Sequence, residues 1–147
     1  MITFDVEKIG GMLDDIERYL NDLKEMNVKE ENDLTGKERF CAVSMIAFSI
    51  MNRCIDLSNE IISTCKFGIP SSYRDLFEYL YRENVIDKAV RDKMITLVYY
   101  RNLIAHEYHE FNEKEILKFV NEVGISERFL EHIRDFIKAE NKNSNEK

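Results

Sequence analysis

Residues that interrupt helices are scarce in this sequence. Only one Pro and five Gly occur among its 147 residues, whereas folds made of many short strands need frequent turn residues. Hydrophobic residues make up 44% of the chain and charged residues 33%, a balance typical of a folded protein rather than of a disordered or collagen-like chain. This composition predicts an all-α protein.

Cysteine is rare as well. Cys41, Cys54 and Cys65 form an odd-numbered set without C-x-x-C spacing, which argues against a disulfide framework and against a zinc site. We expect all three to be thiols that fill the core. The His, Asp and Glu residues also lack the spacing of metal ligands, so we expect neither a metal ion nor a cofactor.

Long apolar runs are missing from the sequence. The longest one, from Cys41 to Met51, is interrupted by serines and falls short of the ~20 residues that a membrane-spanning helix requires. The first residues contain no basic region that leads into an apolar core, so they do not match a secretory signal. We therefore expect no membrane span and a cytoplasmic location.

An excess of positive charge is also absent. The formal net charge is -7, which is unfavourable for an enzyme that acts on nucleic acid, because phosphate binding normally needs a basic face. A small cleft can still be locally positive on an acidic body. The charge therefore argues against broad, non-specific RNA affinity, and it leaves room for a local phosphate site.

The length of the chain fits one domain. We expect this domain to comprise residues 1–140 and to be followed by a disordered tail, residues 141–147. Apolar residues at spacings of three and four predict a first helix from about Phe4 to Met26 and a second from about Lys37 to Lys66. The polar run 29–37 between them is predicted to be a loop.

The remaining helices are predicted from their capping residues. Gly68 and Pro70 end the second helix. Ser71 or Ser72 caps a short third helix through Tyr81, and Ser72 and Asp75 have the spacing of a capping box. Asp87 is predicted to cap the start of a fourth helix. Asn112 with Glu115 begins a fifth helix, which Gly124 ends, and Ser126 begins a sixth. We therefore expect an all-α bundle of about five to six helices.

The fourth helix carries an arginine where a core residue is expected. Its apolar positions continue by helical spacing onto Arg101; they are Val90, Met94, Leu97 and Val98. Burying an unpaired charge is very costly, so this guanidinium needs an acidic partner, an edge, or a cleft that receives an anion. Asp56 on the second helix is one candidate partner. A structural ion pair and an anion site are both open at this stage.

Other polar residues surround Arg101 on the same helix. Asn102 and His106 are four residues apart and share one face, whereas Arg101 and Tyr108, seven apart, share the neighbouring face. Arg101 and His106 differ by about 140° on an ideal helix. Both side chains can meet at one site if the arginine bends, if the helix ends near His106, or if a second subunit contributes.

These residue types fit the cleavage of a phosphodiester without a metal. A histidine side chain titrates near neutrality and moves protons in both directions, an arginine holds phosphate through paired hydrogen bonds, and an amide orients either of them. The plain alternatives are a surface or capping histidine and a structural arginine. The neighbouring pair Tyr99 and Tyr100 can stack on bases or can pack in the core or in a dimer.

The segment from Arg101 to Tyr108 resembles the Arg-x4-His motif of HEPN domains. Its Arg-x4-His-x-Tyr form is similar to that of the HepT toxins, which are paired with minimal nucleotidyltransferase (MNT) antitoxins. The resemblance extends from Phe40 to Phe119 and includes the segments 54–59 and 72–77. It therefore covers about half of the chain.

The resemblance implies an up-and-down helical bundle that forms a homodimer, with the two motifs facing a shared cleft. It also implies a toxin that cleaves RNA as a metal-independent endoribonuclease. Arg101 would bind the scissile phosphate, His106 would transfer the proton, and Asn102 would orient one of them. Tyr108 would accept AMP from the cognate nucleotidyltransferase, and the added anion would block the cleft.

A second function from another class stays open. The chain can instead be a catalytically silent helical module that dimerises and holds a nucleotidyltransferase partner or a nucleotide. The negative net charge favours this module. The coincidence of Arg101, Asn102, His106 and Tyr108 in one segment favours the ribonuclease.

Overall fold

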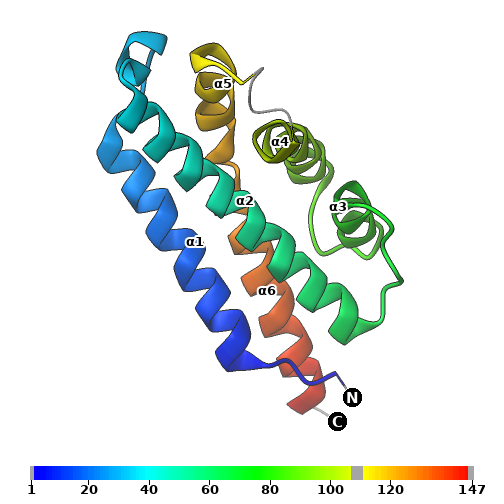
Figure 1. Cartoon of the computed structure of the whole chain (residues 1–147). Helices are drawn as coiled ribbons and strands as arrows, with labels where there is room; N and C mark the ends of the chain where they lie inside the picture. The colour runs from blue at the N-terminus through cyan, green and yellow to red at the C-terminus, as the bar shows by residue number, and fades with distance from the viewer. Residues whose placement is uncertain (1, 107–110, 146–147) are drawn as a thin grey trace.

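The chain folds into helices, as the composition predicts. The computed structural model describes residues 2–106 and 111–145, and within these ranges it contains six α-helices, one short 3₁₀-helix and no strand (Figure 1). In chain order these are α1 (Val6–Met26), η1 (Glu31–Leu34), α2 (Lys37–Cys65), α3 (Tyr73–Arg82), α4 (Lys88–His106), α5 (Glu113–Val123) and α6 (Ser126–Asn145). The prediction of an all-α helical bundle is confirmed.

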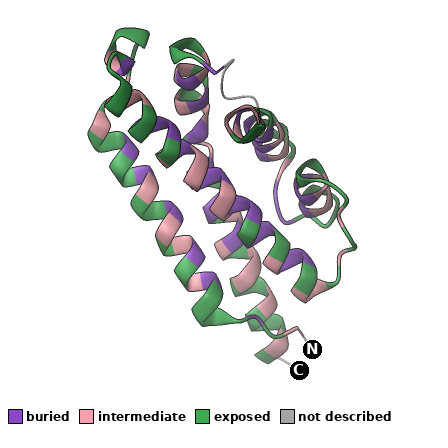
Figure 2. Ribbon diagram, viewed as in Figure 1, coloured by how far each residue is buried: buried purple, intermediate pink, exposed green. Residues whose placement is uncertain are grey.

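The long helix α2 is the centre of the bundle. It packs against α1, α3, α4 and α5, and α1 lies beside it along its length (Figure 1). In the same view α3 and α4 are seen nearly end-on, so this pair crosses the long helices on one side of α2. Figure 2 shows that buried residues recur along α2; fully buried ones include Val43, Ala47, Ile50, Met51, Cys54, Leu57 and Ile61.

The apolar character of α2 follows from this central position. By length and composition alone the helix is apolar enough to cross a membrane, although the longest uninterrupted apolar run in it is short. A helix that is packed by neighbours on several sides must be apolar on each of those sides. Its composition is therefore the one expected of a core helix.

The predicted capping residues are found at the starts of α3, α4 and α5. The Ser72 hydroxyl accepts a hydrogen bond from the Asp75 N–H at 3.2 Å, and Asp87 Oδ1 accepts one from the Val90 N–H at 2.8 Å. Asn112 Oδ1 accepts one from the Glu115 N–H at 3.1 Å. Each bond satisfies a backbone donor that a helix leaves unpaired at its start. The predicted starts of α3, α4 and α5 are thus confirmed.

The loop between α2 and α3 is held in one conformation. Gly68 has φ of 140°, and a Cβ atom there would lie 3.1 Å from the Tyr79 ring. A larger residue is therefore disfavoured both by the backbone and by the space available. The Arg82 guanidinium donates to the Phe67 carbonyl oxygen at 2.6 Å, and the Tyr79 hydroxyl donates to the Ile69 carbonyl oxygen at 3.4 Å.

Three details differ from the sequence predictions. Residues 141–145 continue α6 instead of forming a disordered tail, since no Gly or Pro interrupts the helix and Lys142 suits the negative end of its dipole. The loop 29–37 contains η1, which Asp33 stabilises by accepting hydrogen bonds from the N–H groups of Lys29 and Glu30. Cys41 is exposed rather than in the core, because it lies on the outer face of α2.

The other two cysteines are protected. Cys54 is buried, as predicted, and burial raises its pKa to about 12. Burial also raises the pKa of the half-buried Cys65 to about 11. Both thiols are therefore protonated at neutral pH, and they are poor nucleophiles.

The cap of α4 gives a stability prediction, because this helix carries the polar segment. The N–H of Val90, together with His132 and Arg128, holds the pKa of the Asp87 carboxyl below its ordinary 3.8. Asp87→Ala should lower the free energy of unfolding by about 1 kcal/mol at pH 7 in urea titrations. A lowered pKa means that the stabilisation is present above the ordinary pKa and is lost as pH falls through the lowered one.

The urea midpoints of the wild type and Asp87→Ala should accordingly converge as the pH is lowered below 3.8. Asp87→Asn is the matched control, because an amide oxygen still accepts the hydrogen bond from Val90. The free energy of unfolding at pH 7 should fall less in Asp87→Asn than in Asp87→Ala. Equal losses for the two variants would mean that the cap contributes nothing to α4.

Candidate functional site

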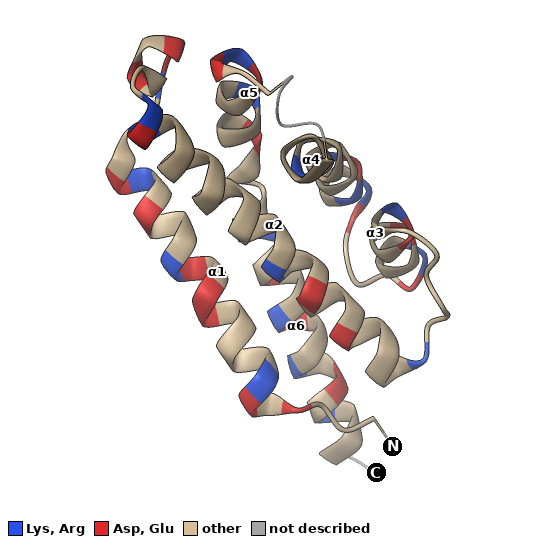
Figure 3. Ribbon diagram, viewed as in Figure 1, with Lys and Arg blue, Asp and Glu red and all other residues tan. Residues whose placement is uncertain are grey.

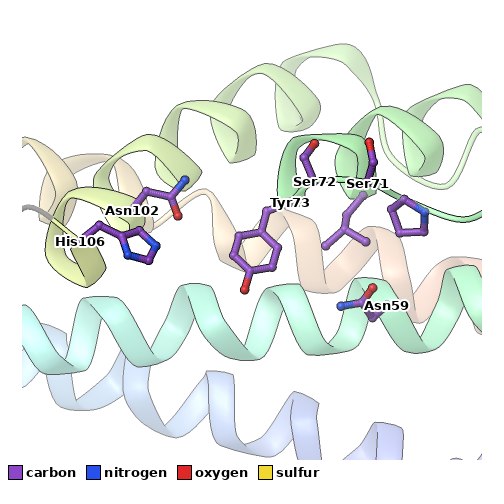
Figure 4. A pocket seen from close by; sticks show the side chains of 8 residues that line it. Asn59, Ser71, Ser72, Tyr73, Asn102 and His106 are labelled. Carbon is purple, nitrogen blue, oxygen red and sulfur yellow. The ribbon is translucent and has the colours of Figure 1, made fainter.

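A pocket lies between α2, α3 and α4. Its volume is about 440 Å³, and it is lined by Asn59, Pro70, Ser71, Ser72, Tyr73, Leu76, Asn102 and His106. Figure 4 shows Asn102 and His106 beside each other on α4, the Tyr73 ring in the middle, and Asn59 on α2. Two of the predicted site residues, Asn102 and His106, therefore line a pocket together with residues of α2, α3 and the loop between them.

Asn102 and His106 reach the pocket because they are one helical turn apart. Residues at i and i+4 lie on the same face of a helix, and both line the same cavity here. His106 is the last residue of α4 and is exposed. The prediction that these two side chains share a face is thereby confirmed.

Arg101 is held by amide oxygens. Its Nε donates a hydrogen bond to Asn52 Oδ1 on α2 at 2.9 Å, and its Nη1 donates one to Asn102 Oδ1 at 3.1 Å. The guanidinium carbon also lies over the rings of Phe48 and Tyr73, at 5.1 Å and 4.9 Å from their centroids. Two hydrogen bonds and two aromatic faces thus fix the plane of the guanidinium.

The described hydrogen-bond partners of Arg101 carry no formal negative charge. An amide oxygen accepts a hydrogen bond without carrying a formal negative charge, and among the described residues no carboxylate forms an ion pair with Arg101. The hypothesis of an Asp56 partner is wrong, because Asp56 pairs with Arg53 at 3.3 Å. Arg53 also pairs with Asp15 on α1 at 3.0 Å, and so the charged side of α2 is directed toward α1.

Arg101 and His106 have different surroundings in the described chain. Arg101 turns toward α2, where it meets Asn52, and it is not among the described residues that line the pocket with His106. Asn102 stands between them: its oxygen contacts Arg101, and its side chain lines the pocket with His106. The three options that the spacing left open for bringing Arg101 and His106 to one site therefore stay predictions.

The tyrosines of the segment have different surroundings. Tyr100 is buried and stacks on Phe119, with centroids 5.7 Å apart and ring planes inclined by 18°, so it belongs to the core. Tyr99 is 58% exposed. Tyr108, the expected AMP acceptor, lies outside the described residues.

Four contributors to the site were missed by sequence analysis. Asn52 and Phe48 contact Arg101 from a helix 49 or more positions earlier in the chain, and no local spacing pattern links them to it. Tyr73 and Asn59 line the pocket from α3 and α2. Tyr73 falls within a segment that resembles HEPN domains, but its role is visible only from the packing of α3 on α4.

The described side chains around the pocket include few charged groups. Within the part of the chain that the structure describes, neither a carboxylate nor a lysine lines it, and Arg101 contacts two of its lining residues, Asn102 and Tyr73. In residues 2–106 and 111–145 no group of three or more His, Cys, Asp and Glu side chains is placed to hold a metal ion. The described pocket therefore offers a histidine, amides, hydroxyls and one adjacent cation.

Comparisons with known proteins place this chain in a family. The HepT-like family, described as Ribonuclease HepT-like, matches residues 12–139, and the chain belongs to it. The mRNA nuclease HepT of Shewanella oneidensis is 35% identical over 88 residues. That match covers 59% of this chain and 63% of the relative, which is less than two thirds of the relative's length.

Solved structures share the fold. A cytosolic protein of unknown function from Bacillus subtilis, YutE, superposes with a TM-score of 0.84 at 21% identity, over 95% of both chains. A tri-AMPylated HEPN toxin of Shewanella oneidensis, solved in complex with its MNT antitoxin, gives a TM-score of 0.80 at 24% identity, over 90% of this chain and 99% of the toxin. The HEPN fold expected from the motif is therefore confirmed.

The contact between Arg101 and Asn52 predicts an energetic coupling. Removing one partner of a hydrogen bond to a charged group leaves the other partly unsatisfied. In a double-mutant cycle of Asn52→Ala and Arg101→Ala, urea unfolding should give a coupling free energy of about 1 kcal/mol.

Asn59 provides the matched control on the same helix. It is two turns from Asn52, about 10 Å along α2, and it has no described hydrogen bond to Arg101. The cycle of Asn59→Ala with Arg101→Ala should therefore be additive. If the Asn52 cycle were equally additive, the contact would not hold the guanidinium in solution.

Proposed function

We propose that the chain is a metal-independent endoribonuclease and the toxin of a toxin-antitoxin pair. The observation that carries this proposal is the link from Arg101 through Asn102 to the pocket that contains His106. Membership in the HepT-like ribonuclease family supports it. The relative named mRNA nuclease HepT supports RNA as the substrate.

The reaction assigned to this site is an internal phosphoryl transfer. The ribose 2′-oxygen attacks the adjacent phosphorus, and His106 accepts the proton that the hydroxyl loses. The bond from phosphorus to the 5′-oxygen breaks, and the 5′-oxygen takes up a proton from the protonated His106. The products are a 2′,3′-cyclic phosphate and a 5′-hydroxyl end. Arg101 binds the phosphate oxygens, on which negative charge builds up in the transition state.

Asn102 serves as a positioning residue in this scheme. Its oxygen accepts a hydrogen bond from Arg101, and its side chain lies beside His106 in the pocket. Asn52 supports the same guanidinium from α2. Because both supports are neutral, the charge of Arg101 is kept for the substrate phosphate.

The acidic net charge is compatible with this local chemistry. Figure 3 shows acidic residues along α1 and in the second half of α2. The lining of the pocket, as far as the structure describes it, contains no carboxylate. We infer that RNA binding depends on the local contacts of the site and not on a broad basic surface.

We further propose that the protein acts as a homodimer, with the pockets of two copies facing one cleft. Tyr99 supports this arrangement. It is 58% exposed and precedes His106 by seven residues, which places it on the same side of α4. A large exposed aromatic side chain beside a polar site is typical of an interface.

A cognate minimal nucleotidyltransferase is proposed as the antitoxin. The structural relative from Shewanella oneidensis is AMPylated and bound to an MNT antitoxin. By analogy, the partner of this chain would transfer AMP to Tyr108, two residues beyond His106. The bulky anion would keep RNA away by its size and by charge repulsion.

One observation favours a silent binding module instead. The net charge of -7 opposes RNA binding at long range. A module that only holds the nucleotidyltransferase needs no proton transfer by His106. Cleavage by site variants therefore decides between the two functions.

We predict that His106→Ala and Arg101→Ala each abolish RNA cleavage. General acid-base catalysis contributes ~10²–10⁴-fold, so the loss of the histidine should lie far outside the error of a gel-based cleavage assay. Wild-type cleavage should persist in EDTA and should leave a 2′,3′-cyclic phosphate, because a 2′-hydroxyl nucleophile needs no metal-bound water.

Far-ultraviolet circular dichroism and light scattering should show that both variants keep the helicity and mass of the wild type. His132→Ala is the control, since His132 contacts Asp87 and lies outside the pocket. It should cleave RNA at the wild-type rate. Unchanged cleavage by folded His106→Ala would exclude the ribonuclease mechanism and favour the binding module.

The second prediction concerns Tyr108. After incubation with the cognate nucleotidyltransferase and ATP, intact-mass spectrometry should show added AMP on the wild type and none on Tyr108→Phe. Tyr99→Phe is the control, because Tyr99 is an exposed tyrosine on α4. A label that disappears in Tyr99→Phe and persists in Tyr108→Phe would assign the acceptor to Tyr99.

A further inference from the structure

The pocket extends well beyond the residues of the cleavage motif. Of the described lining residues, Asn102 and His106 come from α4, and the others come from α2, α3 and the loop between them. The lining combines carboxamides and hydroxyls with the apolar surfaces of Pro70, Tyr73 and Leu76. Because this part of the pocket has no lysine or arginine, it is unsuited to a second phosphate and suited to an uncharged polar group.

Tyr73 occupies the middle of this pocket. Figure 4 shows its ring between Asn102 and His106 on one side and Asn59 on the other. The Arg101 guanidinium lies 4.9 Å from the ring centroid, and 39% of the residue remains exposed. Because Arg101 lies over one face of this ring, the opposite face is the one left to stack on the base of a nucleotide whose phosphate that arginine holds.

Asn59 supplies a polar edge on the opposite side. It is exposed on α2, and none of the hydrogen bonds among the described residues uses its carboxamide. A carboxamide presents a donor and an acceptor side by side, and the edge of a nucleobase does the same. Asn59 can therefore form a pair of hydrogen bonds with one base and a weaker contact with the others.

Hydrogen bonds within the chain preorganise the rim of the pocket, which includes Ser71 and Ser72. The Asp75 carboxylate accepts hydrogen bonds from the Ser71 N–H at 3.0 Å and from the Ser71 hydroxyl at 2.8 Å. These bonds hold the pKa of Asp75 below its ordinary value, so the carboxylate is charged and bonded at neutral pH. Together with the contacts of Tyr79 and Arg82 to the preceding loop, they fix the positions of Ser71 and Ser72.

We propose that this pocket binds one unpaired nucleobase of the RNA substrate, next to the scissile phosphate. Tyr73 stacks on the base and Asn59 reads its edge. The volume of about 440 Å³ lies within the roughly 300–1,000 Å³ of small-ligand pockets. The inference rests on the proposed ribonuclease function, and it specifies single-stranded RNA, since a paired base cannot leave its helix without a cost.

The test compares cleavage of a random-sequence, single-stranded RNA pool by variants of the full chain. Mapped cleavage sites of the wild type should favour one base at one position beside the cut. Asn59→Ala should slow cleavage at that base by about tenfold and leave the other bases unchanged, which flattens the preference. Ser63→Ala, an exposed residue on α2 outside the pocket, should match the wild type.

Tyr73 should give a different signature. Stacking accepts every base, so Tyr73→Leu should raise KM for all four bases, whereas Tyr73→Phe should keep the wild-type KM. A 2′-deoxy substitution at the scissile nucleotide prevents cleavage, and the affinity for such an oligonucleotide reports binding alone. It should fall for Tyr73→Leu and stay unchanged for Tyr73→Phe.

The outcomes separate this inference from the proposed function. Suppose that the wild type cleaves RNA, and that folded Asn59→Ala keeps the same base preference or cleaves at all four bases more slowly by one common factor. This result would overturn the base-binding pocket and leave the ribonuclease function standing. A wild type that cleaves no RNA would overturn the ribonuclease. The affinities of the wild type and Asn59→Ala for 2′-deoxy oligonucleotides that differ in one base would then still decide whether the pocket distinguishes bases.

Discussion

The burial of α2 is the constraint on which the rest of the structure depends. This helix packs against α1, α3, α4 and α5, and its fully buried residues, such as Leu57 and Ile61, lie on the sides that meet them. Between those apolar positions α2 carries Phe48, Asn52 and Asn59, which face the site. Core packing therefore sets the position of the polar side chains, because a rigid, close-packed helix leaves them no independent freedom.

The way in which the bundle accommodates the positive charge of Arg101 connects this packing to function. Arg101 continues the apolar stripe of α4, and it is accommodated there by two amide oxygens and two aromatic rings. A carboxylate partner would have stabilised the charge and also neutralised it. Neutral partners fix the guanidinium and preserve its attraction for an anion. An acidic protein can thereby keep one cationic point beside a pocket without carboxylates.

Local signals explain why much of the fold was predictable. The caps Ser72, Asp87 and Asn112 bond to backbone N–H groups three residues away, so their effect depends on neighbouring sequence alone. The shared face of Asn102 and His106 follows from helical spacing in the same way. The exposure of a helical residue is decided by which distant segments pack against it, and this is why Cys41 differed from expectation.

The sequence by itself determined the helices, their beginnings, and the presence of an arginine, an amide and a histidine within one short segment of α4. Only the tertiary structure decided what Arg101 binds. Asp56 and Asn52 are one turn apart on α2, and periodicity cannot choose between a carboxylate and an amide so close together. Because residues four apart share a helix face, the choice is made by where α4 crosses α2 along its length. The crossing brings Asn52 and Phe48 to a guanidinium 49 or more positions later in the chain, whereas Asp56 pairs with Arg53 on α2 itself.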